Sequence, residues 1–378
     1  MDIFYSAVAQ QENLGDVVIR AVALAWINAS GRHKIHVLAT GMADDYLDAA
    51  VGRPAPDAIV HRSDREYIAS WGASLRQGEA GLVFAPGPRS AAGSRGAVGA
   101  AARAWMLAAV TRSRRGSVVG IGGALSGRNA LAVQLHRRTA GRAEFYGVRD
   151  PVSCQLIGVR AHLVPDVALD MTRALGLDSR NESDRYVAIS LRDPRAVPLS
   201  NLRHLMQRSR KQGLEPVIVT QVRRDEAGHQ ALADALGIEH VGWCGRSTGD
   251  QLDRVLSTYR SSALVVSDRL HACVFGGMAG ALVVNAEQRP GGKIDRTLSW
   301  FMDPIPLRRL IDGDLRDDWS PLSSLRDVQA ARLVVADELL QRGRRAAVAA
   351  LEHVDGTPGD GSDRPGPPIT ANRTGHAG

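Results

Sequence analysis

The stretch ALVVSDRLHACVFGGMAGALVV, residues 263–284, decides the fold class of this chain. Its first part is apolar, rich in β-branched residues and ends at Ser267, which is typical of a buried strand. Its second part has the composition of a packed helix. In such a strand-to-helix turn, Ser267 or Asp268 caps the helix, and Arg269 and His271 fall in its first turn. The stretch therefore predicts one strand–helix unit of a parallel sheet.

The same alternation of short apolar runs with longer segments of helical period recurs along the chain, and it predicts an α/β architecture. The predicted strands are 3–8, 35–39, 82–85, 117–121, 186–190, 216–220 and 263–267. The predicted helices are 16–29, 97–111, 199–212, 226–236 and 251–261. The pattern therefore predicts strands joined by helices along most of the chain.

The length of 378 residues favours two domains. The alternation loosens after Asp166 and restarts with a strand at Tyr186, so we interpret the polar stretch between them as a linker. We expect a first domain over residues 1–175 and a second over 184–315. A helical segment over 320–353 and a tail over 354–378, rich in Gly, Pro and Asp and expected to be disordered, follow.

The formal net charge is +7, and only three of the 47 basic residues are lysines. Codon usage can produce such a preference for arginine over lysine, so the positive charge is only weak support for nucleic-acid binding. Aromatic residues make up 4% of the chain, which argues against surfaces that stack on bases. Cys154, Cys244 and Cys273 lie far apart with no CxxC spacing, which argues against a disulfide framework or a zinc site. The sequence contains no HExxH motif that would indicate another metal site.

The N-terminal residues lack a cationic region followed by an apolar run, and nowhere do roughly 18 uncharged apolar residues follow one another. We therefore expect a soluble or peripheral protein of the cytoplasm.

Loops after the early strands carry the first candidate site residues. Asn13, Gly15 and Asp16 follow the first predicted strand, and such a loop at the carboxyl end of a parallel strand faces the crevice where α/β proteins bind ligands. The alternative is a plain turn at Gly15, with Asp16 capping a helix that begins at residue 17. The GIGG run that contains Gly122 spells neither a P-loop nor GxGxxG, so a strand-to-helix turn is the simpler interpretation there.

Three cations stand where helices are expected to begin. Arg149 precedes Asp150 and a proline, which are good N-cap and N1 residues, and a cation at a helix N-terminus is unfavourable unless an anion binds between them. Arg269 and His271 could hold an anion through the helix dipole and the guanidinium, beside a titratable imidazole. Lys293 follows two glycines, as expected of a mobile loop that folds over a ligand. The alternatives are an arginine and a lysine that point into solvent, and a histidine that only caps its helix.

The order of five motifs resembles that of the polysaccharide pyruvyl transferase family over about residues 3–300. These motifs are the N-x-G-D loop, GIGG at 120–123, V-R-D-x-x-S at 148–153, the Pro165–Asp166 pair and S-D-R-L-H at 267–271. The resemblance implies a GT-B-like fold, in which two Rossmann-like domains face each other across a cleft. It also implies an enzyme that moves the enolpyruvyl unit of phosphoenolpyruvate onto two hydroxyls of a sugar, in a cell-surface polysaccharide or glycolipid. The products are a pyruvate ketal and free phosphate.

The resemblance assigns the donor side. The R-L-H segment falls on Arg269, Leu270 and His271, the V-R-D arginine on Arg149, and the lysine after the last glycine loop on Lys293. Phosphoenolpyruvate carries a phosphate and a carboxylate, which arginine and lysine side chains at helix N-termini match in charge. We expect His271 to act as the general acid or base.

The resemblance also assigns the acceptor side to the first domain. Asp16 is expected to act as an acceptor-side base or sugar ligand, and Asn13, Gly15 and Gly122 to bind the acceptor. The chain departs from the family at 86–88, where it has Pro-Gly-Pro in place of the Gly-Gly-Gly found in many members.

Two other functions stay open at this point. One is a GT-B glycosyltransferase that uses a nucleotide sugar, and the other is an anion-binding regulatory module without catalysis. The expected partners are phosphoenolpyruvate, as co-substrate and not cofactor, and a free or lipid-linked saccharide. A weaker hypothesis is that the arginines of the 322–353 segment bind the inner face of an anionic membrane. The sequence predicts neither the acceptor sugar nor the oligomeric state.

Overall fold

The computed structural model describes residues 1–177, 184–192 and 197–352. Its strands form two sheets, and every strand pair in the described part of the chain is parallel. The first sheet contains β1 (Asp2–Ser6), β2 (Lys34–Leu38), β3 (Ile59–His61), β4 (Ala80–Phe84), β5 (Gly87–Ser90), β6 (Ser117–Ser126), β7 (Phe145–Val148) and β8 (His162–Leu163). The second contains β9 (Tyr186–Ser190), β10 (Glu215–Val219), β11 (Glu239–Val241), β12 (Ser262–Ser267), β13 (Leu282–Asn285) and β14 (Ile305–Pro306).

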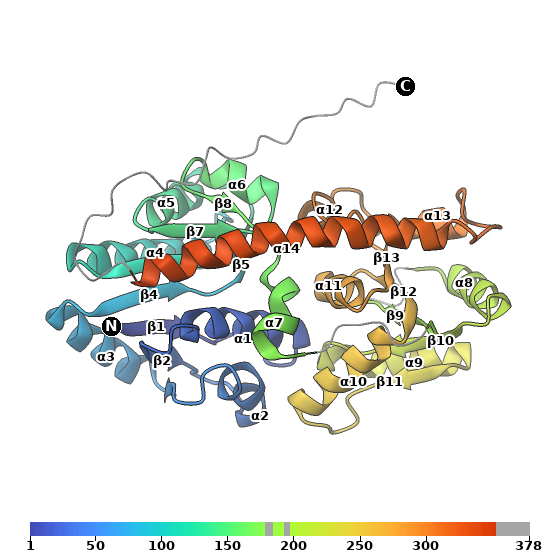
Figure 1. Ribbon diagram of the computed structural model, residues 1–378, viewed down its shortest axis with the longest axis horizontal. Helices are drawn as coiled ribbons and strands as arrows, with labels where there is room; N and C mark the ends of the chain where they lie inside the picture. The colour runs from blue at the N-terminus through green and yellow to red at the C-terminus, as the bar shows by residue number, and fades with distance from the viewer. Residues whose placement is uncertain (178–183, 193–196, 353–378) are drawn as a thin grey trace.

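Helices cover both sheets (Figure 1). Those that follow strands of the first sheet are α1 (Leu14–Asn28), α2 (Asp44–Leu47), α3 (Asp64–Gln77), α4 (Arg95–Ser113), α5 (Ala130–Ala140), α6 (Pro151–Ile157) and α7 (Met171–Leu175). Those of the second are α8 (Leu199–Lys211), α9 (Glu226–Leu236), α10 (Thr248–Arg260), α11 (Leu270–Met278), α12 (Lys293–Leu298) and α13 (Leu307–Ile311). The last helix is α14 (Leu322–Glu352). The α/β class with two parallel sheets is confirmed.

The strand order shows where ligands can bind. It runs β3-β2-β1-β4-β6-β7-β8 in the first sheet, with β5 beside β6, and β11-β10-β9-β12-β13-β14 in the second. Each order reverses its direction once, between β1 and β4 and between β9 and β12. In open parallel sheets the crevice at the carboxyl ends of the strands beside such a reversal is the usual ligand site. The topology therefore directs a ligand to the loops after β1, β4, β9 and β12.

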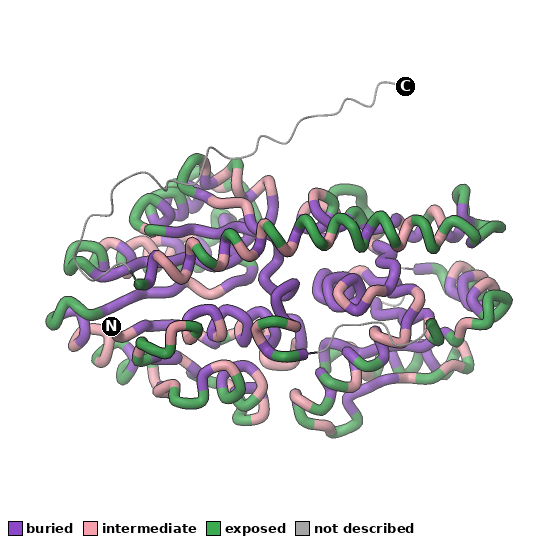
Figure 2. The backbone as a smooth tube through the Cα atoms, viewed as in Figure 1, coloured by how far each residue is buried: buried purple, intermediate pink, exposed green. Residues whose placement is uncertain are grey.

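The two halves share one core. A single cluster of buried apolar side chains includes residues of β1 and α1 from the first half, and of α10 and α11 from the second. Figure 2 shows the strands and α11 as buried, whereas the outer helices alternate between buried and exposed residues.

Helix α14 crosses both halves (Figure 1). Near its start, the side chain of Gln329 accepts a hydrogen bond from the backbone N–H of Val283 on β13, at 2.9 Å. Near its end, the carbonyl of Ala350 accepts a hydrogen bond from the Ser117 hydroxyl at the start of β6, at 2.6 Å. A helix that bonds to both sheets fixes their relative position.

Two interpretations of the sequence were wrong. The helix expected to run through residue 284 ends at Met278, because Gly280 adopts a left-handed conformation and the β-branched run beyond it pairs with β12 as β13. The stretch read as a linker begins with a turn of 3-10 helix, Val167–Asp170, and α7, and the Trp26 indole donates a hydrogen bond to Asp170 at 2.7 Å. That part is thus packed core.

The rest of the expected linker, at 178–183, and the tail at 354–378 lie outside the described residues. The domain boundaries at 175 and 184 stay a proposal. Strands β3, β5, β7, β8, β11, β13 and β14 were not predicted.

Candidate functional site

The loops that follow β1 and β10 are joined across the two halves by main-chain hydrogen bonds. The N–H of Leu14 donates to the carbonyl of Gln221 at 3.2 Å, and the N–H of Arg223 donates to the carbonyl of Glu12 at 2.9 Å. Between them, Asn13 and Val222 form an isolated antiparallel bridge. The start of α1 is thereby held against the second half of the molecule.

Asn13 caps α1, and its side chain accepts a hydrogen bond from the N–H of Gly15 at 3.1 Å. The expectation that Asp16 caps a helix beginning at residue 17 is therefore wrong, because the helix begins at Leu14 and Asp16 lies in its first turn. There Asp16 accepts a hydrogen bond from the N–H of Gln10, at 3.3 Å. A carboxylate at this point also interacts favourably with the helix dipole.

Gly15 allows the closest approach between the two halves at this site. A Cβ atom built on Gly15 would lie 1.9 Å from Nδ1 of His271, and 2.4 Å from Cγ of the same ring. No side chain can occupy that space while the imidazole stays where it is. Gly15 is thus not a turn residue, as one interpretation held, but the surface against which His271 packs.

The other ring nitrogen of His271 faces Asp166. Nε2 lies 3.8 Å from Oδ2 of Asp166, and the same oxygen accepts a hydrogen bond from Arg149 at 2.7 Å. All three side chains are buried. Burial raises the pKa of Asp166, but the Arg149 charge and the contact with His271 outweigh it and hold that pKa well below its ordinary value. An ionised carboxylate therefore links Arg149 to His271.

This geometry corrects two interpretations. Arg149 does not point into solvent, since only 1% of it is exposed. Asp166, which the sequence shows as an isolated acidic residue, is its partner. The expected caps at Asp150 and Pro151 are present, and the Asp150 carboxylate accepts a hydrogen bond from the N–H of Ser153 at 2.9 Å.

Arg269 is the N-cap residue of α11 and not part of its first turn. The Ser267 hydroxyl accepts a hydrogen bond from its N–H at 2.9 Å, and its guanidinium forms an ion pair with Asp225. Burial lowers the pKa of Arg269, against the effect of Asp225, and burial also raises the pKa of Asp225. The two groups are thus held as a partly desolvated pair.

Leu270 and Gly122 do not join this cluster. Leu270 is buried in the shared core. Gly122 adopts a left-handed conformation, with φ of 57°, and a Cβ on it would lie 3.0 Å from Val167 and 3.3 Å from Pro86. The structure gives both residues a packing role, and ligand contacts by them stay a prediction.

Lys293 begins α12, so it lies at a helix start and not within a mobile loop. The Glu287 carboxylate accepts hydrogen bonds from the N–H groups of Lys293, at 2.8 Å, and Ile294, at 2.9 Å. Lys293 as a whole is exposed, but its ammonium lies among protein groups that desolvate it. Desolvation and then the Arg149 charge lower its pKa to about 8, whereas Asp166 and Asp16 act in the opposite direction.

Sequence reasoning missed several members of the cluster. Arg192 follows β9, and its N–H donates to the Asp268 carboxylate at 2.6 Å. The Arg296 guanidinium lies 3.9 Å from Asp150, and the Trp300 indole donates to the carbonyl of Arg149 at 3.3 Å. Only their position in the sequence could have indicated such residues, since Arg192 and Asp225 each follow the carboxyl end of a predicted strand.

Among the described residues, four buried nitrogen atoms of the cluster have no hydrogen-bond partner: Nε of Arg149, Nε of Arg269, Nε of Arg296 and Nε2 of His271. An unsatisfied buried donor costs about 1–3 kcal/mol. Three of them, on Arg149, Arg269 and His271, belong to residues that the sequence selects as anion ligands. The site therefore has unused capacity to donate hydrogen bonds to an anion.

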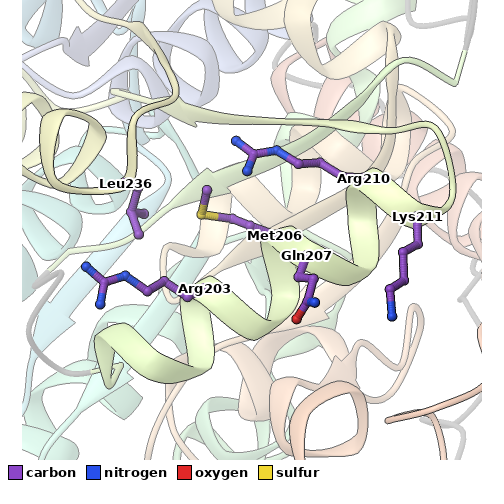
Figure 3. A pocket seen from close by; sticks show the side chains of 6 residues that line it. All are labelled: Arg203, Met206, Gln207, Arg210, Lys211 and Leu236. Carbon is purple, nitrogen blue, oxygen red and sulfur yellow. The ribbon is translucent and has the colours of Figure 1, made fainter.

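A surface hollow on α8 is a separate feature (Figure 3). It is lined by Arg203, Met206, Gln207, Arg210, Lys211 and Leu236, and none of these is a predicted site residue. Among the residues described, no group of His, Cys, Asp and Glu side chains is arranged to hold a metal ion. Nor does any helix of the described part combine the length and apolar character that crossing a membrane requires.

Two solved structures of similar fold are UDP-GlcNAc 2-epimerase from Neisseria meningitidis bound to UDP-GlcNAc and a putative UDP-N-acetylglucosamine 2-epimerase from Listeria monocytogenes. The first has a TM-score of 0.57 and 9% sequence identity, and the match covers 93% of this chain and 100% of that one. The second has a TM-score of 0.53 and 10% identity, covering 92% of this chain and 93% of that one. At such identities the likeness shows the GT-B-like fold alone.

No curated protein sequence matches this chain. The family model for polysaccharide pyruvyl transferases, however, matches residues 13–281, which is most of the chain and includes the α1 start, Arg149, Asp166 and the R-L-H segment. The chain belongs to the polysaccharide pyruvyl transferase family and is a transferase with a GT-B-like fold.

Proposed function

We propose that this transferase moves the enolpyruvyl unit of phosphoenolpyruvate onto two hydroxyls of a sugar in a cell-surface polysaccharide or glycolipid, at the cytoplasmic side of the membrane. In this reaction two new C–O bonds form at one carbon of the donor, and the bond from that carbon to the phosphate oxygen breaks. One hydroxyl proton ends on the donor's methylene carbon, which becomes a methyl group, and the other leaves with phosphate. The reaction needs no oxidant or reductant.

The observation that carries the proposal is the set of unsatisfied buried donors on Arg149, Arg269 and His271, in a cluster that also contains Lys293. Arg149 and Arg269 each share their charge with one carboxylate. The Lys293 ammonium has no ion pair within the described ranges, so it is the cation most available to a phosphate. A donor with a phosphate and a carboxylate can use all of these groups at once.

His271 is our candidate for proton transfer. Asp166 lies near Nε2, and Gly15 faces Nδ1 at the start of α1, where Asp16 stands in the first turn. The ring is thus between the donor-side cations and the acceptor-side carboxylate. His271 can give a proton to the methylene carbon, while Asp16 binds the acceptor hydroxyl or takes its proton. Asn13 and Gly15, which form the α1 start, support the acceptor side.

The runner-up donor is a nucleotide sugar, because one of the solved structures of similar fold holds UDP-GlcNAc. Titration of the chain with phosphoenolpyruvate and, separately, with UDP-GlcNAc, followed by calorimetry, distinguishes the two. We expect binding of phosphoenolpyruvate that is weakened in Lys293→Gln and unchanged in Lys211→Gln, a lysine of the α8 hollow. Binding of UDP-GlcNAc alone would overturn the proposal.

A further inference from the structure

The distribution of charge along the chain is uneven. Residues 80–143, between Glu79 and Glu144, contain ten arginines and no aspartate or glutamate. Ten of the 47 basic side chains thus fall in a stretch that holds none of the 40 acidic ones, and the remaining sequence carries an excess of acidic residues. The positive net charge of the protein is therefore concentrated in one segment.

This segment supplies α4 and α5, which pack against each other on one face of the first sheet. The opposite face of that sheet carries α1 and α14. Figure 1 shows α4 and α5 at the end of the molecule far from α8. Their outer surface is separate from the site described above.

Spacing of three and four residues places Arg103, Met106, Val110 and Arg114 in one stripe along α4. All four are exposed, Met106 at 53% and Val110 at 38%. Helix α5 and the turn after it present a second stripe, with Leu131, which is 57% exposed, Gln134, Arg138 and Arg142. We call these two stripes the α4–α5 face. It combines arginines with exposed apolar side chains.

The arginines of the α4–α5 face are not engaged by carboxylates. In the part of the chain that the structure describes, the one ion pair made by an arginine of residues 80–143 joins Arg112, in the last turn of α4, to Glu144. Arg138 stacks over the Trp105 ring, with 5.8 Å from its guanidinium carbon to the ring centroid. Arg103, Arg114 and Arg142 have neither contact, so their charges are open to an external partner.

Two other basic surfaces within the described residues, the α8 hollow and the exposed side of α14, lack one of these properties. The α8 hollow has Arg203, Arg210 and Lys211, but its methionine, Met206, is buried. The exposed side of α14 carries Val334 and Val335, but Arg332 pairs with Asp303 there, and Glu338 adds a negative charge. The hypothesis that α14 meets the membrane is therefore less well supported than one for the α4–α5 face.

We infer that the α4–α5 face docks onto an anionic lipid bilayer. Arginines attract anionic headgroups, and apolar side chains between them enter the boundary between headgroups and acyl chains. A nucleic acid would use the arginines but would leave Met106, Val110 and Leu131 exposed to water. This inference rests on the surface alone and is independent of the donor chemistry.

The experiment is sedimentation of the full chain with vesicles of phosphatidylcholine, with and without phosphatidylglycerol, at low and high salt. We expect binding that needs phosphatidylglycerol. The variant Arg103→Gln/Arg114→Gln/Arg142→Gln loses roughly a hundredfold in affinity, since each arginine near an anionic surface contributes about fivefold. The matched control Arg203→Gln/Arg210→Gln/Lys211→Gln removes the same charge from the α8 hollow and keeps wild-type binding.

A second variant, Met106→Ser/Val110→Ser, separates a bilayer from a nucleic acid. It weakens vesicle binding and leaves any binding to duplex DNA unchanged. The inference is overturned if the wild type does not sediment with anionic vesicles, if the control loses as much affinity as the triple variant, or if Met106→Ser/Val110→Ser binds vesicles as the wild type does. Binding of phosphoenolpyruvate by the triple variant, measured in parallel, reports separately on the proposed function.

Discussion

Gly15 at the start of α1 packs directly against the imidazole of His271 at the start of α11, and a Cβ on the glycine would stand 1.9 Å from Nδ1. The two residues belong to different halves of the molecule and follow the carboxyl ends of β1 and β12. On the opposite side of the ring, Asp166 faces Nε2. His271 is thereby fixed from two directions, which is what a group that transfers protons requires.

Replacing Gly15 with alanine should move His271. The new Cβ cannot coexist with the present ring position, and a displacement of about 1 Å at a reacting group can cost on the order of a hundredfold in rate. We expect such a loss of kcat/KM with the fold retained. The matched control is Gly249→Ala, in the first turn of α10, where a Cβ meets nothing within 4 Å. Equal activity of the two variants would contradict the packing role of Gly15.

Replacing Asp166 with asparagine should affect both stability and activity. It removes the charge between Arg149 and His271, and leaving one partner of a buried ion pair uncompensated costs about 3 kcal/mol of the free energy of unfolding. Turnover falls as well, because His271 loses the negative charge that lies 3.8 Å from its Nε2. Asp170→Asn is the control, since Asp170 is buried and its partners Arg173, Arg344 and Trp26 are not members of this cluster. It should lose stability but keep phosphoenolpyruvate turnover.

Affinity for phosphoenolpyruvate should fall as the pH rises through about 8. Lys293 has a pKa lowered to about 8, so its ammonium loses its charge above that value, while the phosphate, with a second pKa near 6, stays dianionic. Loss of one charge-assisted contact weakens binding roughly tenfold. Calorimetry between pH 7 and pH 9 measures it. In Lys293→Arg, which stays charged, the decrease should disappear, and a persistent decrease would assign the pH dependence to another group.

Acid should destabilise the protein through a pair of buried histidines. Nδ1 of His36 lies 2.9 Å from Nε2 of His61, and burial lowers the pKa of both rings, against the effect of Asp2 on His36 and of Glu66 on His61. Because their folded-state pKa values lie below those of the unfolded chain, the folded state binds fewer protons. Stability is therefore full above the unfolded value of about 6.5 and falls as the pH drops below it.

Chemical denaturation at pH 7 and pH 5 checks this expectation. The slope for one such histidine is at most about 1.4 kcal/mol per pH unit. His61→Gln should show a smaller difference between the two pH values than the wild type. The difference does not vanish, because four further histidines of the described residues also have lowered pKa values: His136, His162, His229 and His240. An unchanged difference would show that the His36–His61 pair does not contribute.

The sequence alone sufficed to predict the fold class and the starts of the helices at Arg149 and Arg269, but not α12, which Lys293 begins. The alternation of apolar runs and helical segments predicts both sheets, and the S-D-R-L-H segment does begin a helix after a strand. The prediction from sequence failed at β13, because a short apolar run after glycines has no periodicity that distinguishes a strand from a helix. It also failed at β8 and β14, which have two residues each.

The pairing within the site could not be predicted for a different reason. Asp166 reaches His271, and Asp225 reaches Arg269, only after the strands of each sheet have been ordered and the two halves have been brought together. Such contacts depend on the topology of the sheets, and the spacing of residues along the chain does not predict them. The role of Gly15 was missed for the same reason, since its neighbour lies in the other half of the molecule.

The most direct test of this account is release of phosphate from phosphoenolpyruvate by His271→Ala in the presence of a saccharide acceptor. Alanine removes the imidazole but is a good helix former at this position, and Arg149, Arg269 and Lys293 remain, so the variant should fold and should still bind phosphoenolpyruvate. We predict that its turnover falls roughly a hundredfold or more below that of the wild type, as expected for a general acid or base. Phosphate release at a near-normal rate would contradict the central role assigned to His271.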